Sequence, residues 1–363
     1  MLFQIVSITN VSCRKYIRTL TGTAMKTRGD RVKDNTALII LGMHRSGTSL
    51  LTGLLGQVGV RMGRSLYAPQ KGVNEKGFWE HEDIVDTHDE LLLHLRSQWD
   101  DLLPLKDKWW EDEAVQPYVA RLQSLVKRDF SEAPVWALKD PRMCRLLPLW
   151  MPIFKARGIR PVFISMNRNP FEVIASLQKR DRFSREKALV LWLNHTLSAE
   201  SHSRGQSRIF IDFDQVVTDP VRVLQTIERE TGIVFPVSVN QANEKIGRFV
   251  SPDLRHHKAD KTDAGATRYQ GLEGMAHELY SALSEKAAES GGSHNGNLDE
   301  RIDSVAADFA SYQKKWNPEL IEQIRYLNQE HADYRIKFFR IYRSLSWLLA
   351  RPFWLIEKIL RKY

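Results

Sequence analysis

The sequence predicts a three-layer α/β fold with a central parallel sheet and a helical C-terminal tail. Four short strand-like runs, at 37–41, 135–138, 161–165 and 208–212, alternate with segments of helical period. Strands that alternate with helices form parallel sheets, because the crossover helices cover both faces. The first run has no polar interruption, as expected of a strand that is buried on both faces.

A loop of small residues follows the first strand. Gly42, Ser46 and Gly47 need little space, and from Thr48 the apolar residues recur with helical spacing. A strand, a glycine-bounded loop and a helix favour an anion, because loop amides point inward and the helix N-terminus carries partial positive charge. The sequence therefore predicts a P-loop-like phosphate site, although a turn that binds nothing can have the same pattern.

The other helices are predicted from apolar spacing and from their end signals. Pro170 and Pro220 stand at or just before first helical positions, and Gly232 follows the end of a helix. The predicted helices cover 48–58, 84–95, 115–130, 171–179, 185–201 and 220–231.

The chain divides into four predicted parts. Residues 1–34 carry no acidic side chain before Asp30, so they form a basic arm or precede a true start at Met25. The other parts are a main domain at 35–256, a linker-like segment at 257–298 with one short helix at 275–283, and a helical tail at 299–363.

Composition is that of a soluble globular protein. The 363 residues are 42% hydrophobic and 27% charged, with a formal net charge of +9. A basic chain suits anionic partners such as a nucleotide or an anionic lipid surface, although much of the excess lies near the two ends. Only Cys13 and Cys144 occur, so we predict no disulfide framework, no metal site and a reducing, cytoplasmic compartment.

The loop departs from the nucleoside-triphosphate P-loop at one position. The spacing Gly42-x4-Gly47 matches the first half of that motif, but Thr48 stands where a Lys would reach the β- and γ-phosphates. Arg45 supplies a cation from inside the loop instead. This difference favours an anion other than a triphosphate and weighs against a P-loop kinase or NTPase, as does the lack of an obvious magnesium-binding Asp after a strand.

Two further blocks carry charge at the ends of predicted strands. Arg168 follows the third strand, and Ser176 comes eight residues later in the next helix. An arginine can bind phosphate through two parallel hydrogen bonds, and a serine can add a third. Lys139-Asp140-Pro141 ends the second strand, and the carboxyl ends of parallel strands face the crevice where such sheets bind ligands.

The three blocks together resemble the sulfotransferases that use 3′-phosphoadenosine 5′-phosphosulfate (PAPS). His44-Arg45-Ser46-Gly47-Thr48-Ser49 is similar to their 5′-phosphosulfate loop, and the Arg–Ser pair is similar to their 3′-phosphate block. The Lys-Asp-Pro block resembles the tyrosylprotein branch. The resemblance covers 36–256 and implies that Arg45, Ser46, Gly47, Thr48 and Ser49 hold the phosphosulfate, Arg168 and Ser176 hold the 3′-phosphate, and Lys139 and Arg45 assist transfer.

The catalytic base is predicted from a loop between these blocks. Asn74-Glu-Lys-Gly-Phe-Trp-Glu80 resembles a segment of bacterial carbohydrate-type sulfotransferases, and its last residue, Glu80, is our predicted base. His81 is the alternative. Arg255, with Arg248 and His256, is a candidate for further phosphate contacts or part of a solvated basic loop.

The C-terminal tail has a heptad pattern that could pair two copies of the chain or pack on the main domain. Its apolar positions include Leu320, Ile324, Leu327 and Tyr334, and its last part is basic and rich in Trp. Such a segment also suits the surface of an anionic membrane, since its charges exclude a membrane span.

We therefore expect a PAPS-dependent sulfotransferase that acts on an acceptor hydroxyl, predicted to belong to a carbohydrate or cell-surface glycan. No metal and no nucleic acid partner is expected, and the site could face the inner side of the membrane. Loops at 61–115 and 180–206 are expected to form the acceptor pocket. A kinase or NTPase, or an inactive membrane-associated scaffold, is the alternative.

Overall fold

The computed structural model describes residues 35–69, 77–250, 269–289 and 296–342. The predicted basic arm and the Trp-rich end of the tail lie outside the described residues, as do Arg255 and His256. All described residues belong to one unit of the chain, which begins at Asp34.

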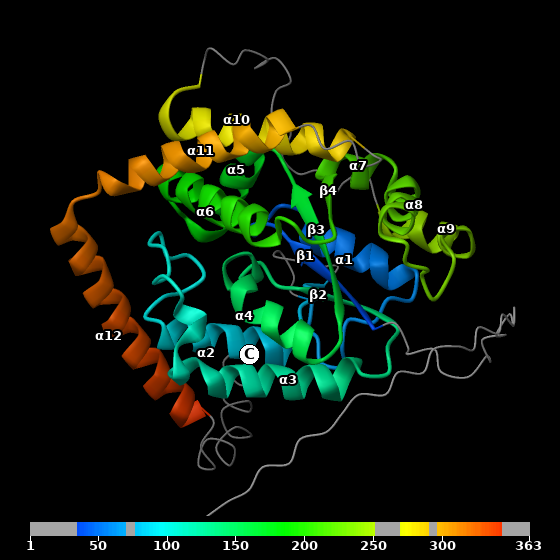
Figure 1. Ribbon diagram of the computed structural model, residues 1–363, viewed down its shortest axis with the longest axis horizontal. Coiled ribbons are helices and arrows are strands. Elements are labelled where there is room, and N and C mark those ends of the chain that lie inside the picture. The colour runs from blue at the N-terminus through cyan, green and yellow to red at the C-terminus, as the bar shows by residue number, and fades with distance from the viewer. Residues whose placement is uncertain (1–34, 70–76, 251–268, 290–295, 343–363) are drawn as a thin grey trace, which may run out of the picture. The chain divides into compact units, whose positions relative to one another are not determined.

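A sheet of four parallel strands forms the centre of this unit (Figure 1). Its strand order is β2-β1-β3-β4, so the first strand of the chain lies in the middle. The strands are β1 (Thr36–Leu41), β2 (Val135–Lys139), β3 (Arg160–Asn167) and β4 (Arg208–Asp212). The predicted α/β fold with a central parallel sheet is confirmed.

The alternation of side chains along β1 explains why this strand reads as an unbroken apolar run. Ala37, Ile39 and Leu41 belong to one buried cluster, together with residues of α2, α3 and α4. Leu38 and Ile40 belong to a second cluster on the other face, with residues of α1, α8 and α9. Because both faces are covered by helices, neither set of side chains meets water.

The helices agree with most of the predicted ranges, and their bounds are as follows. They are α1 (Thr48–Gln57), α2 (Glu82–His94), α3 (Gln116–Phe130), α4 (Met143–Ala156), α5 (Pro170–Asp181), α6 (Arg185–Ser203), α7 (Phe213–Thr218), α8 (Pro220–Thr231), α9 (Val239–Phe249), α10 (Gly271–Ala288), α11 (Gly296–Lys314) and α12 (Pro318–Tyr342), with short 3₁₀ turns η1 (Trp109–Glu111) and η2 (Glu113–Val115).

Helix α4 lies in a segment where the sequence analysis assigns no helix, and it contains Pro148 and Pro152. A proline inside a helix has no N–H to donate to the carbonyl four residues earlier. For Pro148 that carbonyl belongs to Cys144, and Nδ1 of His202 on α6 lies 3.2 Å from it. A hydrogen bond from a neighbouring helix thus replaces the one that the proline removes.

Helix α10 is longer than the short helix predicted within a linker-like segment. It spans 271–288, and its buried residues pack with α5, α6 and α11 in a third hydrophobic cluster. Ser284 on α10 donates a hydrogen bond of 3.2 Å to Asp212 at the end of β4, and Asn167 donates to both of these side chains. At least this part of 257–298 therefore belongs to the folded core, because small buried residues such as Ala276 and Ala282 let the helix approach closely.

Helix α12 forms the described part of the tail and lies against α2 (Figure 1). Three residues of the predicted heptad row, Leu320, Leu327 and Tyr334, are exposed. Within the described residues, no helix combines the length and apolar character that crossing a membrane requires.

Candidate active site

The loop between β1 and α1 makes a tight turn that needs left-handed backbone conformations. Arg45 has φ 73° and Gly47 has φ 88°. A left-handed conformation costs an ordinary residue roughly 1–2 kcal/mol, so Arg45 is held there by its surroundings. A Cβ atom added to Gly47 would lie 2.3 Å from the Phe213 ring. Position 47 therefore needs glycine for two separate reasons.

Helix α1 begins without the usual acceptors at its N-terminus. Its N-cap residue is Gly47, no side chain caps it, and its first turn carries no acidic residue. Most helices satisfy their first amides with the side chain of Ser, Thr, Asp or Asn at this position. The amides at the start of α1 and the positive end of its dipole are thus available to an anion.

Arg45 connects this loop to the second predicted phosphate block. Its Nε donates a hydrogen bond of 2.8 Å to Oγ of Ser176 on α5, which is 131 residues away in sequence. Arg168, at the end of β3, donates a hydrogen bond of 2.9 Å to the backbone carbonyl of Arg45. The structure therefore brings together Arg45, Arg168 and Ser176, which the sequence analysis assigns to two different phosphate groups.

Arg168 is held in place from two further directions. Its guanidinium pairs with Glu172 one turn into α5 at 3.1 Å, and it lies over the Phe213 ring at 4.1 Å from the centroid. Both charged side chains of this pair are largely buried. A guanidinium fixed by a carboxylate and an aromatic face loses little rotamer freedom when it binds a ligand.

The concentration of positive charge around the loop is measurable in its effect on Arg45. Burial lowers the pKa of Arg45, and the neighbouring guanidinium groups of Arg180 and Arg168 lower it further. These like charges repel one another when no anion lies between them. The cluster is therefore suited electrostatically to an anion.

Lys139 and Glu80 form a buried ion pair at the carboxyl end of β2. Nζ of Lys139 lies 2.5 Å from Oε1 of Glu80, and the two side chains are 3% and 10% exposed. The sequence analysis assigns these residues to different roles and does not anticipate their contact. Glu80 is thus placed beside the other predicted catalytic group, with its carboxylate engaged by Lys139.

Asp140 anchors a network that the sequence analysis does not assign. Its carboxylate accepts hydrogen bonds from Arg142, and it lies 2.7 Å from Nδ1 of His88. Arg142 also pairs with Asp89 at 2.6 Å. Burial alone would raise the pKa of Asp140, but Arg142 and His88 outweigh burial and lower that pKa below its usual range. Asp140 is therefore an ionised anchor for its basic neighbours.

The network also determines which nitrogen of His88 carries the proton. Nε1 of Trp150, which can only donate, lies 2.9 Å from Nε2 of His88. Nε2 must therefore accept, and the proton of the neutral ring is on Nδ1, where it is donated to Asp140. The sequence signal for this network is Arg142 itself, which directly follows the Lys-Asp-Pro block at a strand end.

His81, the alternative base, lies in a different cluster. Its Nε2 lies 2.6 Å from Oδ2 of Asp129, both side chains are fully buried, and the ring lies beside Phe130. Hydrogen bonds from Arg128 chiefly lower the pKa of Asp129, against the opposing effect of burial. His81 is therefore engaged with α3 instead of the Lys139 pair.

His44 is a residue of the loop to which the sequence analysis gives no role of its own. Its ring lies 4.4 Å from the Trp99 ring, and its Nε2 is buried without a hydrogen-bond partner. Burial and the nearby Arg142 and Arg180 lower the pKa of His44 well below its usual range. His44 is therefore a neutral imidazole beside Arg45 at neutral pH.

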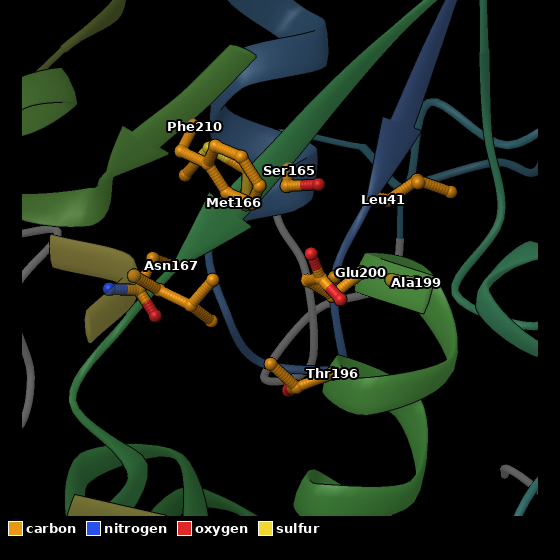
Figure 2. Close-up of a pocket in the computed structure, with 10 residues that line it drawn as sticks. Leu41, Ser165, Met166, Asn167, Thr196, Ala199, Glu200 and Phe210 are labelled. Atoms are coloured by element: carbon orange, nitrogen blue, oxygen red, sulfur yellow. The ribbon is translucent and has the colours of Figure 1, made fainter. Parts of the chain in front are cut away.

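A small cavity lies behind the start of the loop, where β1 and β3 end below α6 (Figure 2). Its volume is about 20 Å³, which is room for one water molecule. Oγ of Ser165 and Oδ1 of Asn167 are both buried without a hydrogen-bond partner, and both residues line this cavity. The cavity is far too small for a nucleotide.

An aromatic pair covers the middle of α1. The Trp79 and Phe249 rings meet edge to face, 6.2 Å apart, and a Cβ atom on Gly53 would collide with both of them. Ser49, in the first turn of α1, donates a hydrogen bond of 3.3 Å to the carbonyl of Phe78. The loop at 77–80 is therefore fixed to α1, which places Glu80 near the phosphate loop. Ser46 and Thr48 are buried in the same region.

The last phosphate candidates and a metal site can be considered for the described residues alone. Arg248 pairs with Glu244 on the exposed side of α9. In the described ranges no three His, Cys, Asp or Glu side chains gather in a way that could hold a metal ion.

Comparison with known proteins gives no match to any family model and no match among curated proteins. Two solved structures are similar. One is the "Sulfotransferase Domain from the Synechococcus PCC 7002 Olefin Synthase", with 18% identity and a TM-score of 0.37 over 76% of this chain and 94% of that chain. The other is the "Sulfotransferase Domain from the Curacin Biosynthetic Pathway", with 13% identity and a TM-score of 0.34 over 76% and 98%. Both are sulfotransferase domains. They belong to the class of protein that the loop motif of this chain resembles.

Proposed function

We propose that this chain is a PAPS-dependent sulfotransferase that acts on an acceptor hydroxyl. The observation that carries the proposal is the meeting of Arg45, Arg168 and Ser176 at the uncapped start of α1. This arrangement supports an anion with more than one charged group, because two guanidinium groups and several backbone amides converge there. A 5′-phosphosulfate and a 3′-phosphate on one nucleotide meet that requirement.

The same residues favour PAPS over a nucleoside triphosphate. Thr48 stands in the position of the P-loop Lys, so a γ-phosphate would have no cation there. The positive charge lies instead on Arg45 and Arg168, toward α5. A P-loop kinase or NTPase remains the alternative that a magnesium-dependent preference for ATP would restore.

In the proposed reaction the donor, when bound, supplies the sulfuryl group. A bond forms between the acceptor oxygen and sulfur, the bond from sulfur to the phosphate oxygen breaks, and the acceptor proton moves to the carboxylate of Glu80. Lys139 neutralises the charge that develops on the leaving oxygen. The 2.5 Å contact of these two residues supports a coupling of their roles, since a shift of Lys139 toward the leaving oxygen releases Glu80 to take the proton.

We propose a carbohydrate hydroxyl as the acceptor. Half-buried aromatic side chains, Trp99 and Phe183, lie beside His44 with ring centroids 5.8 Å apart, and they come from the two loop regions expected to form the acceptor pocket. Arg180 lies over the Trp99 ring. A surface that combines aromatic faces with polar groups suits a sugar, which has both apolar faces and hydroxyl groups.

The test is thermal stabilisation by 3′-phosphoadenosine 5′-phosphate (PAP), compared with ATP and ADP, in the absence of magnesium. A ligand that binds only the native state raises its melting temperature. We expect stabilisation by PAP alone, its loss in Arg168→Ala, and its retention in Arg229→Ala, which removes an exposed arginine paired with Glu230 on α8. Arg168→Lys keeps the charge and controls for a general loss of stability.

Two results would overturn the proposal. One is a preference for ATP that requires magnesium, and the other is no response to any of the three nucleotides. If PAP binds, transfer of labelled sulfate to a panel of glycans and small alcohols tests the acceptor separately, and labelling of non-carbohydrate alcohols alone would refute the carbohydrate assignment.

A further inference from the structure

Exposed large apolar and aromatic side chains are concentrated on α12. Among the described residues, Leu320, Tyr326, Leu327 and Tyr334 on this helix are 54%, 61%, 60% and 69% exposed. The rest of the described chain contributes only Val234 and Val237 to this class. Single exposed residues need no explanation, but several on one helix indicate an interaction surface.

Three of these residues form a row on one side of the helix, which we call the α12 row: Leu320, Leu327 and Tyr334. Their spacing of seven residues places them nearly above one another, since a heptad drifts by only about 20° on a straight helix. The side of α12 that is shielded from solvent is another one. It comprises Ile321, Ile324, Asn328 and Ala332, which are at least half-buried. The contact with the rest of the chain therefore leaves the α12 row uncovered.

The charges of α12 are divided between its two halves. Residues 318–330 contain three acidic side chains and one basic one, whereas 331–342 contain one acidic and three basic ones. The α12 row is centred on Leu327, with Leu320 and Tyr334 seven residues to either side. When the helix is turned end over end about Leu327, the row falls on itself and the acidic half falls on the basic half.

We propose that α12 pairs with α12 of a second copy of this chain, antiparallel, about a twofold axis at Leu327. In this arrangement Leu327 meets Leu327 of the other copy, and Leu320 meets Tyr334. The acidic half of each helix lies beside the basic half of the other, whereas a parallel pair would bring like charges together. A twofold interface of this kind is self-complementary and closes at two copies.

The pairing is expected to be reversible. Three apolar residues from each helix make a small contact compared with the roughly 1,200–2,000 Å² of a stable interface. Monomer and dimer should therefore exchange with concentration, and added salt should weaken the dimer because part of the attraction is between exposed charges.

Disulfide trapping distinguishes the antiparallel pair from the other arrangements. The experiment uses the full chain with Cys13→Ser, and Cys144, which is buried, stays in place. Leu327→Cys should form a disulfide-linked dimer on mild oxidation. Leu320→Cys alone and Tyr334→Cys alone should not, because each would lie roughly 20 Å from its copy, beyond the reach of a disulfide. A mixture of these two variants should form the linked dimer. Glu322→Cys, an exposed position on the far side of α12, is the control.

Each outcome decides the proposal. Linking of all three single variants would show a parallel pair, and linking no faster than Glu322→Cys would show no pairing through this face, so either result would overturn it. Sedimentation of the unmodified chain gives an independent test. We expect mass to rise with concentration toward twice the monomer, to stay at the monomer for Leu327→Glu, and to be unaffected by Val234→Glu. A monomer at all concentrations would also overturn the proposal.

Discussion

Nζ of Lys139 lies 2.5 Å from Oε1 of Glu80, in a contact that joins the end of β2 to a loop 59 residues earlier in the chain. Both side chains are almost closed to solvent. A buried pair of opposite charges is sensitive to the loss of either partner, because the remaining charge is left uncompensated. The contact therefore links stability to the proposed transfer step.

Breaking this pair should destabilise the protein. We expect Lys139→Met or Glu80→Gln to reduce the free energy of unfolding by about 3–5 kcal/mol, because each leaves or exposes an unpaired buried group. The double variant should lose less than the sum of the two single losses. Urea unfolding of all four proteins measures the coupling, and strictly additive losses would contradict a direct interaction.

The identity of the base can be tested by two isosteric substitutions. On the proposed function, Glu80→Gln should lower kcat by about 10²–10⁴-fold while PAP still stabilises the protein. His81→Gln should lower the melting temperature, since Asp129 loses its buried partner, and should leave kcat within a few-fold. The reverse pattern would assign the base to His81. Circular dichroism at the assay temperature controls for unfolding.

Gly47→Ala should cost more than a substitution at another left-handed glycine. Gly205 has φ 77° and open space around its Cβ position, so Gly205→Ala measures the backbone cost alone, about 1–2 kcal/mol. At Gly47 the added methyl would also lie 2.3 Å from the Phe213 ring, which adds about 1–3 kcal/mol. Unfolding curves of both variants give the difference, and equal losses would show that Phe213 moves aside freely.

Acidification should destabilise the protein through His195. Burial lowers the pKa of His195 to about 3, with a further lowering by Arg145, whereas an unfolded histidine has a pKa of about 6.5. Between these values the unfolded chain holds the extra proton, so stability is complete above pH 6.5 and is lost as pH falls toward 3. At pH 5 the expected loss is about 2 kcal/mol.

His195→Asn provides the control for this pH dependence. Asparagine can still donate toward the Leu191 carbonyl that Nδ1 of His195 contacts at 2.9 Å, but it does not titrate. The variant should lose less stability than the unmodified chain between pH 7 and pH 5. Part of the slope should remain, because burial also lowers the pKa values of His44 and His202. An unchanged slope would rule out His195 as a source.

Several elements could be predicted from local sequence because their signals are local. The apolar run at 37–41 predicts a strand that is buried on both faces, and the structure confirms it as β1. Pro220 and Gly232 predict the two ends of α8. Helix α4 could not be predicted in this way. Its two prolines argue against a helix, and the bond that compensates Pro148 comes from His202 on α6.

The sequence by itself determined the strand–loop–helix unit and the eight-residue spacing of Arg168 and Ser176, since both depend on residues that are close in the chain. Only the tertiary structure decided that Arg45 reaches Ser176, that Lys139 pairs with Glu80, and that α10 joins the core. The physical reason is that periodicity and turn signals act over one or two turns of chain. Contacts between distant segments depend instead on how helices and strands pack, which no short stretch of sequence encodes.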